Sequence, residues 1–121
     1  MGKNKKILIV DDEPFCVKVL QRRLEYNDYE VIVASDGEEA LAKTRSERPD
    51  LILLDLMLPL LNGVEVCSRL KADPDLQQIP IIVCTAKYDH KPEKNSALPV
   101  DCYFPKPIDV ELLLEKLEEF L

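Results

Sequence analysis

The chain has 121 residues, of which 46% are hydrophobic and 32% are charged, and its formal net charge is −7. This length fits one domain with a single core, so we expect one domain over residues 1–121. No apolar stretch approaches the ~20 residues of a membrane helix, and the basic start lacks the apolar segment of a signal peptide, so the expected location is the cytoplasm. The negative charge disfavours direct contact with nucleic acid.

Strands and helices are predicted to alternate. Short runs rich in Ile, Val and Leu are separated by longer segments of helical period, which is typical of an α/β fold with a parallel sheet. The strands are predicted near residues 7–10, 30–34, 51–54, 81–84 and 102–104. The run LILL at 51–54 is the most apolar, so this strand should lie in the centre of the sheet.

Two helices are expected in the first half of the chain. In the first, Val17, Leu20 and Leu24 recur with helical spacing and should face the sheet. The second should begin at Asp36, whose side chain can cap the free amides, with Glu39 in a capping-box position. It should stop before the proline at position 49.

Two more helices are expected in the second half, at 63–72 and at 110–121, the latter capped by Asp109. The residues of the last helix expected to be buried are Leu113, Leu117 and Phe120. The segment 87–98 is polar and Pro92 interrupts it, so only a short or broken helix is predicted there.

Cysteine and histidine usage limits the possible metal chemistry. The four cysteines are Cys16, Cys67, Cys84 and Cys102. They lie in or beside apolar segments without a C-x-x-C pair, so we expect buried, reduced thiols. The single histidine, His90, excludes a multi-histidine metal site and is expected to be a solvated loop residue.

Polar residues stand at the carboxyl ends of four predicted strands. They are Asp11, Asp12, Asp55, Thr85 and Lys106. Functional groups in an open α/β sheet gather at this edge. If the strand order is 2-1-3-4-5, the first and third strands are neighbours, and the three aspartates converge on one crevice.

Such a cluster of carboxylates requires protonation or a cation. Two carboxylates about 4 Å apart repel by about 4 kcal/mol at an effective dielectric constant of about 20. Magnesium is suited to the position, because it takes oxygen ligands and is typically held by one or two carboxylates plus phosphate oxygens. Asp12 and Asp55 would supply side-chain oxygens, and Asp11 could bind through water.

Each of these residues also has a simpler interpretation. An acidic pair before a helix, such as Asp11 and Asp12, is often only an N-cap and a partner of the helix dipole. Asp55 alone could be a turn residue. Thr85 could be a strand end, and Lys106 a solvated charge. The functional interpretation is favoured because all five residues fall at strand ends along one edge.

Four motifs give the chain a family resemblance. They are DDEP at 11–14, LLDLMLP at 53–59, TA at 85–86 and KP at 106–107. In their order and spacing the chain resembles the receiver domain of two-component response regulators, chemotaxis receivers among them, over essentially its whole length. The resemblance implies a flavodoxin-like, doubly wound, five-stranded parallel sheet of order 2-1-3-4-5, with helices on both faces.

The resemblance also implies a phosphoryl-accepting site that needs Mg²⁺. Asp55 would accept a phosphoryl group from the phosphohistidine of a sensor histidine kinase or a histidine phosphotransfer protein. Asp12, Asp55 and the backbone carbonyl of Met57 would hold the ion, with Asp11 assisting. Lys106 would pair with a phosphate oxygen as a point charge.

A conformational switch is implied as the output. Thr85 would donate its hydroxyl to the phosphate, and the space it leaves would let the ring of Tyr103 turn inward. The simpler interpretation of Tyr103 is an ordinary edge-strand tyrosine. The resemblance further implies a cis bond between Lys106 and Pro107, and a downstream effector protein or output domain, with the receiver a monomer or weak dimer.

Two other functions are weighed. One is a receiver-like protein-binding module without phosphorylation, which the complete set of site residues disfavours. The other is a phosphatase of the haloacid dehalogenase kind, which needs a second Asp two residues after the nucleophile as general acid. That position is Met57 here. We therefore expect no enzyme, but a signalling domain that promotes only its own phosphorylation and dephosphorylation.

Overall fold

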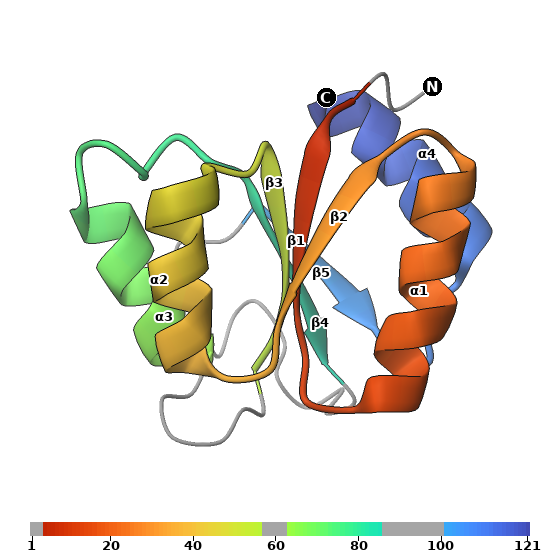
Figure 1. The fold of residues 1–121 in the computed structure, drawn as a ribbon, viewed down its shortest axis with the longest axis horizontal. Coiled ribbons are helices and arrows are strands. Elements are labelled where there is room, and N and C mark those ends of the chain that lie inside the picture. Colours follow the sequence, from red (N-terminus) through yellow and green to blue (C-terminus); the bar gives the residue numbers. More distant parts are fainter. Residues whose placement is uncertain (1–3, 57–62, 86–100) are drawn as a thin grey trace.

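Strands and helices alternate along the chain in the computed structural model, which describes residues 4–56, 63–85 and 101–121, apart from the side chain of Thr85. The elements are β1 (Lys6–Val10), α1 (Pro14–Tyr26), β2 (Glu30–Ala34), α2 (Gly37–Glu47), β3 (Leu51–Asp55), α3 (Gly63–Ala72), β4 (Ile81–Thr85), β5 (Cys102–Pro105) and α4 (Val110–Phe120). Figure 1 shows their arrangement. Every strand and helix predicted within these ranges is present. The predicted broken helix at 87–98, with His90, lies outside the described residues.

The five strands form one parallel sheet in the order β2-β1-β3-β4-β5. This confirms the α/β class and the strand order implied by the resemblance. β3 is central as predicted, and all five of its residues are buried. β5 is an edge strand, which explains how it accommodates Pro105, a residue without an amide donor.

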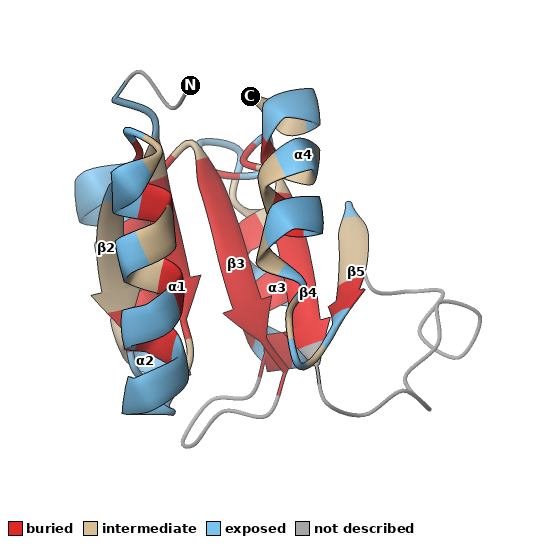
Figure 2. Cartoon of the chain, turned by 90° about the vertical axis from the view of Figure 1, so that its right-hand side faces the viewer, coloured by how far each residue is buried: buried red, intermediate tan, exposed pale blue. Residues whose placement is uncertain are grey.

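Helices cover both faces of the sheet, with α1 and α4 on one face and α2 and α3 on the other (Figure 1). Because side chains alternate along a strand, β3 serves both layers: Ile52 and Leu54 pack toward α2 and α3, and Leu51 and Leu53 pack toward α1 and α4. In Figure 2 the inner strands are buried along their length, whereas the helices expose their outer sides.

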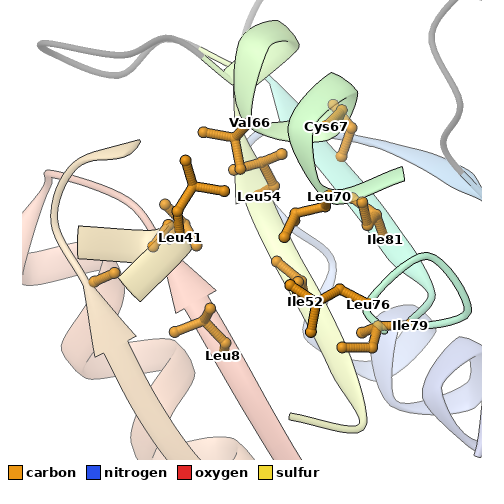
Figure 3. Packing of buried hydrophobic residues seen from close by; sticks show 14 of the residues in the cluster. Leu8, Leu41, Ile52, Leu54, Val66, Cys67, Leu70, Leu76, Ile79 and Ile81 are labelled. Carbon is orange, nitrogen blue, oxygen red and sulfur yellow. The ribbon is translucent and has the colours of Figure 1, made fainter. Parts of the chain in front are cut away.

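The layer beneath α2 and α3 is built mainly from apolar side chains. Figure 3 shows Leu41 of α2 and Val66 and Leu70 of α3 directed toward Ile52 and Leu54 of β3. α1 buries the three residues predicted to face the sheet, Val17, Leu20 and Leu24, and α3 buries Val66 and Leu70 with the same kind of helical spacing. Burying such a side chain contributes about 1.5–3 kcal/mol to the free energy of unfolding. The strand ends that carry the polar residues are therefore held by a well-packed core.

Two predicted helix caps are confirmed. The Asp36 side chain accepts a hydrogen bond from the Glu39 amide at 2.8 Å, and the Glu39 carboxylate accepts one from the Ser35 amide at 2.8 Å. Asp109 accepts one from the Leu112 amide at 3.2 Å. In α4, Leu113 and Leu117 are fully buried as expected, but Phe120, in the last turn, is only half-buried.

The prediction of four buried thiols is wrong for Cys16 and holds fully only for Cys67 and Cys84. Cys67 and Cys84 are buried and Cys102 is half-buried, but Cys16 is exposed, and all four are free thiols. Cys16 precedes Val17 on α1 and lies off the stripe that faces the sheet, so a position beside apolar residues did not place it in the core.

The buried thiols are expected to resist alkylation while the protein is folded. Burial raises the pKa of Cys67 and of Cys84 to about 12. Because the thiolate is the nucleophile, roughly one such thiol in ten thousand would be reactive at pH 8, even if reagent could reach it. Iodoacetamide labelling at pH 8, followed by peptide mass spectrometry, should modify Cys16 first and the buried pair only in urea. Labelling of Cys84 as fast as Cys16 in the native protein would contradict this.

No helix in the three described ranges is both long enough and apolar enough to cross a membrane.

Candidate functional site

Three carboxylates meet where β1 and β3 end. The two strands are neighbours with Val10 opposite Leu54, so the residues that follow β1 lie beside Asp55, the last residue of β3. One carboxylate oxygen from each of Asp11, Asp12 and Asp55 lies within 4.8 Å of the other two. The predicted convergence of the three aspartates is therefore confirmed.

A single ammonium reaches into this cluster. Lys106, which follows β5, places its Nζ 2.7 Å from Oδ2 of Asp11 and 3.2 Å from Oδ2 of Asp55. The three side chains are only 15%, 11% and 8% exposed, respectively. Burial opposes the charged form of Lys106, but its hydrogen bonds and attraction to Asp11 and Asp55 outweigh burial, so the pKa of this ammonium lies above its ordinary value. Lys106 is therefore a largely buried positive charge among carboxylates, and the simpler interpretation of Lys106 as a solvated charge is wrong.

The two carboxylate oxygens of Asp11 accept hydrogen bonds from two different donors. Oδ2 accepts from Lys106, and Oδ1 accepts from the backbone amide of Glu13 at 3.0 Å. The N-cap of α1 is Glu13, which makes no side-chain capping bond. The simpler interpretation, in which the acidic pair serves as the N-cap, is therefore wrong: Asp11 shapes the turn before α1, and Asp12 projects from it as an exposed residue.

The donor chemistry of the cluster fits a magnesium ion. Carboxylate oxygens are the hard ligands that Mg²⁺ prefers, and the ion usually keeps several waters. Asp55 is buried and fixed by the end of β3, whereas Asp12 is exposed, which leaves one side of the cluster open to solvent. The third expected ligand, the carbonyl of Met57, lies outside the described residues.

The two expected switch residues are only partly visible. Thr85 is the last residue of β4, opposite Pro105, and its side chain is not among the described parts. Tyr103 is half-buried on edge strand β5 and packs against the core beneath α3. Its hydroxyl is buried, without a hydrogen-bond partner in the described part of the chain. The bond between Lys106 and Pro107 is cis, as the resemblance implied.

Comparison with known proteins decides the family. A family model for the response regulator receiver domain matches residues 7–118. The chain belongs to this family. The receiver domain is 51% identical over 106 residues to the alkaline phosphatase synthesis transcriptional regulatory protein PhoP of Bacillus subtilis, an alignment that covers 86% of this chain and 43% of that protein. It thus spans about half the length of the curated relatives it matches.

Two solved structures that contain magnesium have the same fold as this chain. The receiver domain matches response regulator TrrA of Thermotoga maritima in complex with Mg²⁺-BeF at a TM-score of 0.87 and 34% identity, covering 97% of this chain and 99% of that one. It also matches the receiver domain of sensor histidine kinase PA1611 of Pseudomonas aeruginosa, which has a magnesium ion in its active site cleft (TM-score 0.89, 28% identity, 97% of each chain).

Gly63 supports the site of this receiver domain in a way that the sequence analysis missed. A Cβ added to Gly63 would lie 2.7 Å from the carbonyl oxygen of Asp55 and 2.7 Å from Cα of Leu56, and both are backbone atoms. The amide of Gly63 also donates to the carbonyl of Leu56 at 3.1 Å. The start of α3 is therefore packed directly on the backbone that carries Asp55. The dipeptide Asn-Gly at the start of the predicted helix 63–72 was the available signal.

The substitution Gly63→Ala is expected to destabilise the domain and slow its chemistry. Overpacking against backbone costs about 1–3 kcal/mol, which exceeds the gain of up to about 1 kcal/mol in helix propensity. Urea unfolding should show the loss of stability, and the rate of phosphorylation by acetyl phosphate should fall because Asp55 moves. Ser68→Ala, at an exposed position of the same helix, should do neither. Equal stability of Gly63→Ala and wild type would contradict the close approach.

Proposed function

We propose that residues 1–121 act as a single, cytoplasmic receiver domain whose Asp55 accepts a phosphoryl group from the phosphohistidine of a sensor histidine kinase or histidine phosphotransfer protein. The observation that supports this best is the setting of Asp55. Among the charged residues of the described ranges, Asp55 is the one that is buried, with 7% of its surface exposed. It lies beside two further carboxylates and 3.2 Å from an ammonium.

The transfer exchanges one bond to phosphorus for another. An oxygen of Asp55 attacks the phosphorus, the P–N bond of the donor breaks, and its electron pair stays on the imidazole nitrogen. Bound Mg²⁺ would neutralise the phosphoryl oxygens as they approach the carboxylates. Asp12 and Asp55 would hold the ion, with Asp11 and the carbonyl of Met57 assisting.

Asp11 and Lys106 have two further roles in this proposal. The ammonium of Lys106 is in position to pair with an oxygen of the acyl phosphate once Asp55 is modified. Asp11 keeps Lys106 in place during this exchange, because its 2.7 Å ion pair does not involve the reacting carboxylate. In this proposal the chain promotes only its own phosphorylation and dephosphorylation.

The output is proposed to be a population shift between two conformations. The Thr85 hydroxyl would move to the phosphate, and the position of Tyr103 would follow. PhoP of B. subtilis is named a transcriptional regulatory protein, and the matched part is 43% of its length. We therefore propose that this domain acts through an attached output domain or a separate effector, as a monomer or weak dimer.

The direct test is intact mass spectrometry with acetyl phosphate as the phosphoryl donor. We expect the mass of one phosphoryl group to be gained with Mg²⁺ and not with EDTA. If the mass stays unchanged where a known receiver is labelled in parallel, the chain is a receiver-like binding module instead. Turnover of an added phosphate ester would instead favour a phosphatase.

Asp12→Asn should remove the stabilisation that Mg²⁺ gives to the folded domain. A ligand at ten times its Kd stabilises by about 1.4 kcal/mol, so Mg²⁺ should raise the Tm of wild type measurably. In EDTA, Asp12→Asn should be at least as stable as wild type, because it relieves repulsion among three carboxylates. Asp75→Asn, at an exposed carboxylate in the connection after α3, should respond to Mg²⁺ as wild type does. An unchanged response of Asp12→Asn would remove Asp12 from the metal site.

A further inference from the structure

A pocket of about 420 Å³ lies between the N-terminal half of α1 and the connection from β5 to α4. Both elements are at the right of Figure 1. Its walls include Phe15 and Val19 of α1, Ile108 of the connection and Val110, the first residue of α4. Phe15 is 80% exposed and Val19 is 44% exposed, so much of their apolar surface remains in contact with water. The volume is within the range of about 300–1,000 Å³ typical of small-molecule sites.

One end of the pocket is negatively charged. Asp11 and Glu13 line it together with Lys106. The ammonium of Lys106 is already shared between Asp11 and Asp55, at 2.7 and 3.2 Å. The carboxylate of Glu13 accepts only a thiol hydrogen bond, from Cys16 at 3.4 Å, and no ion pair joins it to a cation in the described part of the chain.

The local charge balance therefore favours a cation. Of the two carboxylates that line the pocket, Asp11 is paired with the ammonium of Lys106, whereas Glu13 has no cation partner among the described residues. A ligand with a positive group would meet Glu13 at the rim, and its apolar body would cover Phe15 and Val19. An anionic ligand would meet an excess of like charge.

We propose that this pocket binds a small hydrophobic cation, namely an amine or guanidine carried by an aromatic or branched aliphatic body. Binding at this pocket needs neither the nucleophile nor a metal. The pocket adjoins the phosphoryl-accepting site through Asp11 and Lys106, which line both. Most of the affinity would come from burying the apolar body, and the charge would select the class of ligand.

Titration with 4-phenylbutylamine tests the proposal, in EDTA and followed by amide chemical shifts. For a ligand of this size we expect saturable binding with a Kd on the order of 1 mM, with the largest shifts at Phe15, Val19 and Ile108. The neutral 4-phenylbutanol should bind about three-fold more weakly, and the anionic 4-phenylbutyrate at least about ten-fold more weakly. Asp55→Asn should bind the amine as well, which separates this result from the proposed function.

Two matched pairs of variants locate the site. Phe15→Ala should weaken amine binding about ten-fold, whereas Tyr26→Ala, at an 86% exposed aromatic of the same helix outside the pocket, should not. Glu13→Gln should weaken it about three-fold and erase the preference over the alcohol, whereas Glu38→Gln on α2 should not.

Three results would overturn the proposal. One is the absence of saturation up to about 10 mM amine. Another is equal binding of the three probes, which would mark a neutral apolar surface. The third is a combination of two results: wild type does not bind the amine, and Phe15→Ala is no longer phosphorylated by a kinase. This combination would assign the pocket to a partner protein.

Discussion

Asp55→Asn is expected to abolish phosphoryl uptake from acetyl phosphate. An amide oxygen carries no negative charge to attack phosphorus, and no other described carboxylate combines burial with a place at the end of a central strand. The variant should fold, because asparagine has nearly the same shape and removes one of three mutually repelling charges. Intact mass spectrometry with Mg²⁺ should show no added phosphoryl group, and urea unfolding in EDTA should show at least wild-type stability.

The control for this variant is a second partly buried aspartate. Asp50 accepts a hydrogen bond from the Lys6 amide at 2.8 Å at the opposite end of the sheet, and an asparagine there can accept the same bond. Asp50→Asn should therefore be phosphorylated like wild type. Full labelling of Asp55→Asn would refute the assignment of the nucleophile.

Lys106→Met is expected to slow phosphorylation about 10²-fold. The side chain is similar in length but lacks the charge that would pair with the phosphoryl oxygens, and losing one such preorganised donor typically costs about 10²–10³ in rate. The substitution also leaves the carboxylates of Asp11 and Asp55 without their ammonium. In EDTA we expect a loss of stability of about 1–3 kcal/mol. Intact mass spectrometry of samples quenched at successive times measures the rate, and urea unfolding in EDTA measures the stability.

Lys116→Met provides the matched control. Lys116 forms a surface ion pair with Glu119 at 3.3 Å on α4, and such pairs contribute about 0–1 kcal/mol. It should change neither the rate nor, beyond that range, the stability. Wild-type phosphorylation rates in Lys106→Met would show that the ion pairs of Lys106 are structural only.

The sequence was sufficient for the fold because its local signals agree with one another. The LILL run of β3 is apolar at every position, as a strand covered on both faces requires. The stripe of α1 and the caps at Asp36 and Asp109 fix where the helices begin and which side they bury. The strand order was different: it came from the family resemblance, since periodicity does not say which strands are neighbours.

The site was predictable to the level of which residues meet. Asp11, Asp12 and Asp55 stand at strand ends, and parallel strands bring their carboxyl ends to one edge. The sharing of Lys106 between Asp11 and Asp55 depends on side-chain reach across β4 and was not predictable from position. The contact of Gly63 with the Asp55 backbone is likewise a distance between segments, and the exposure of Cys16 depends on its angle around α1.

The most direct test of the account is the chemical identity of residue 55 after phosphorylation. Borohydride reduces an aspartyl phosphate to homoserine, so the domain should be treated with acetyl phosphate and Mg²⁺, reduced, digested and sequenced by mass spectrometry. We predict homoserine at position 55 and aspartate at positions 11 and 12. Homoserine at another position, or unaltered aspartate at 55 in protein that has gained a phosphoryl group, would contradict the central claim.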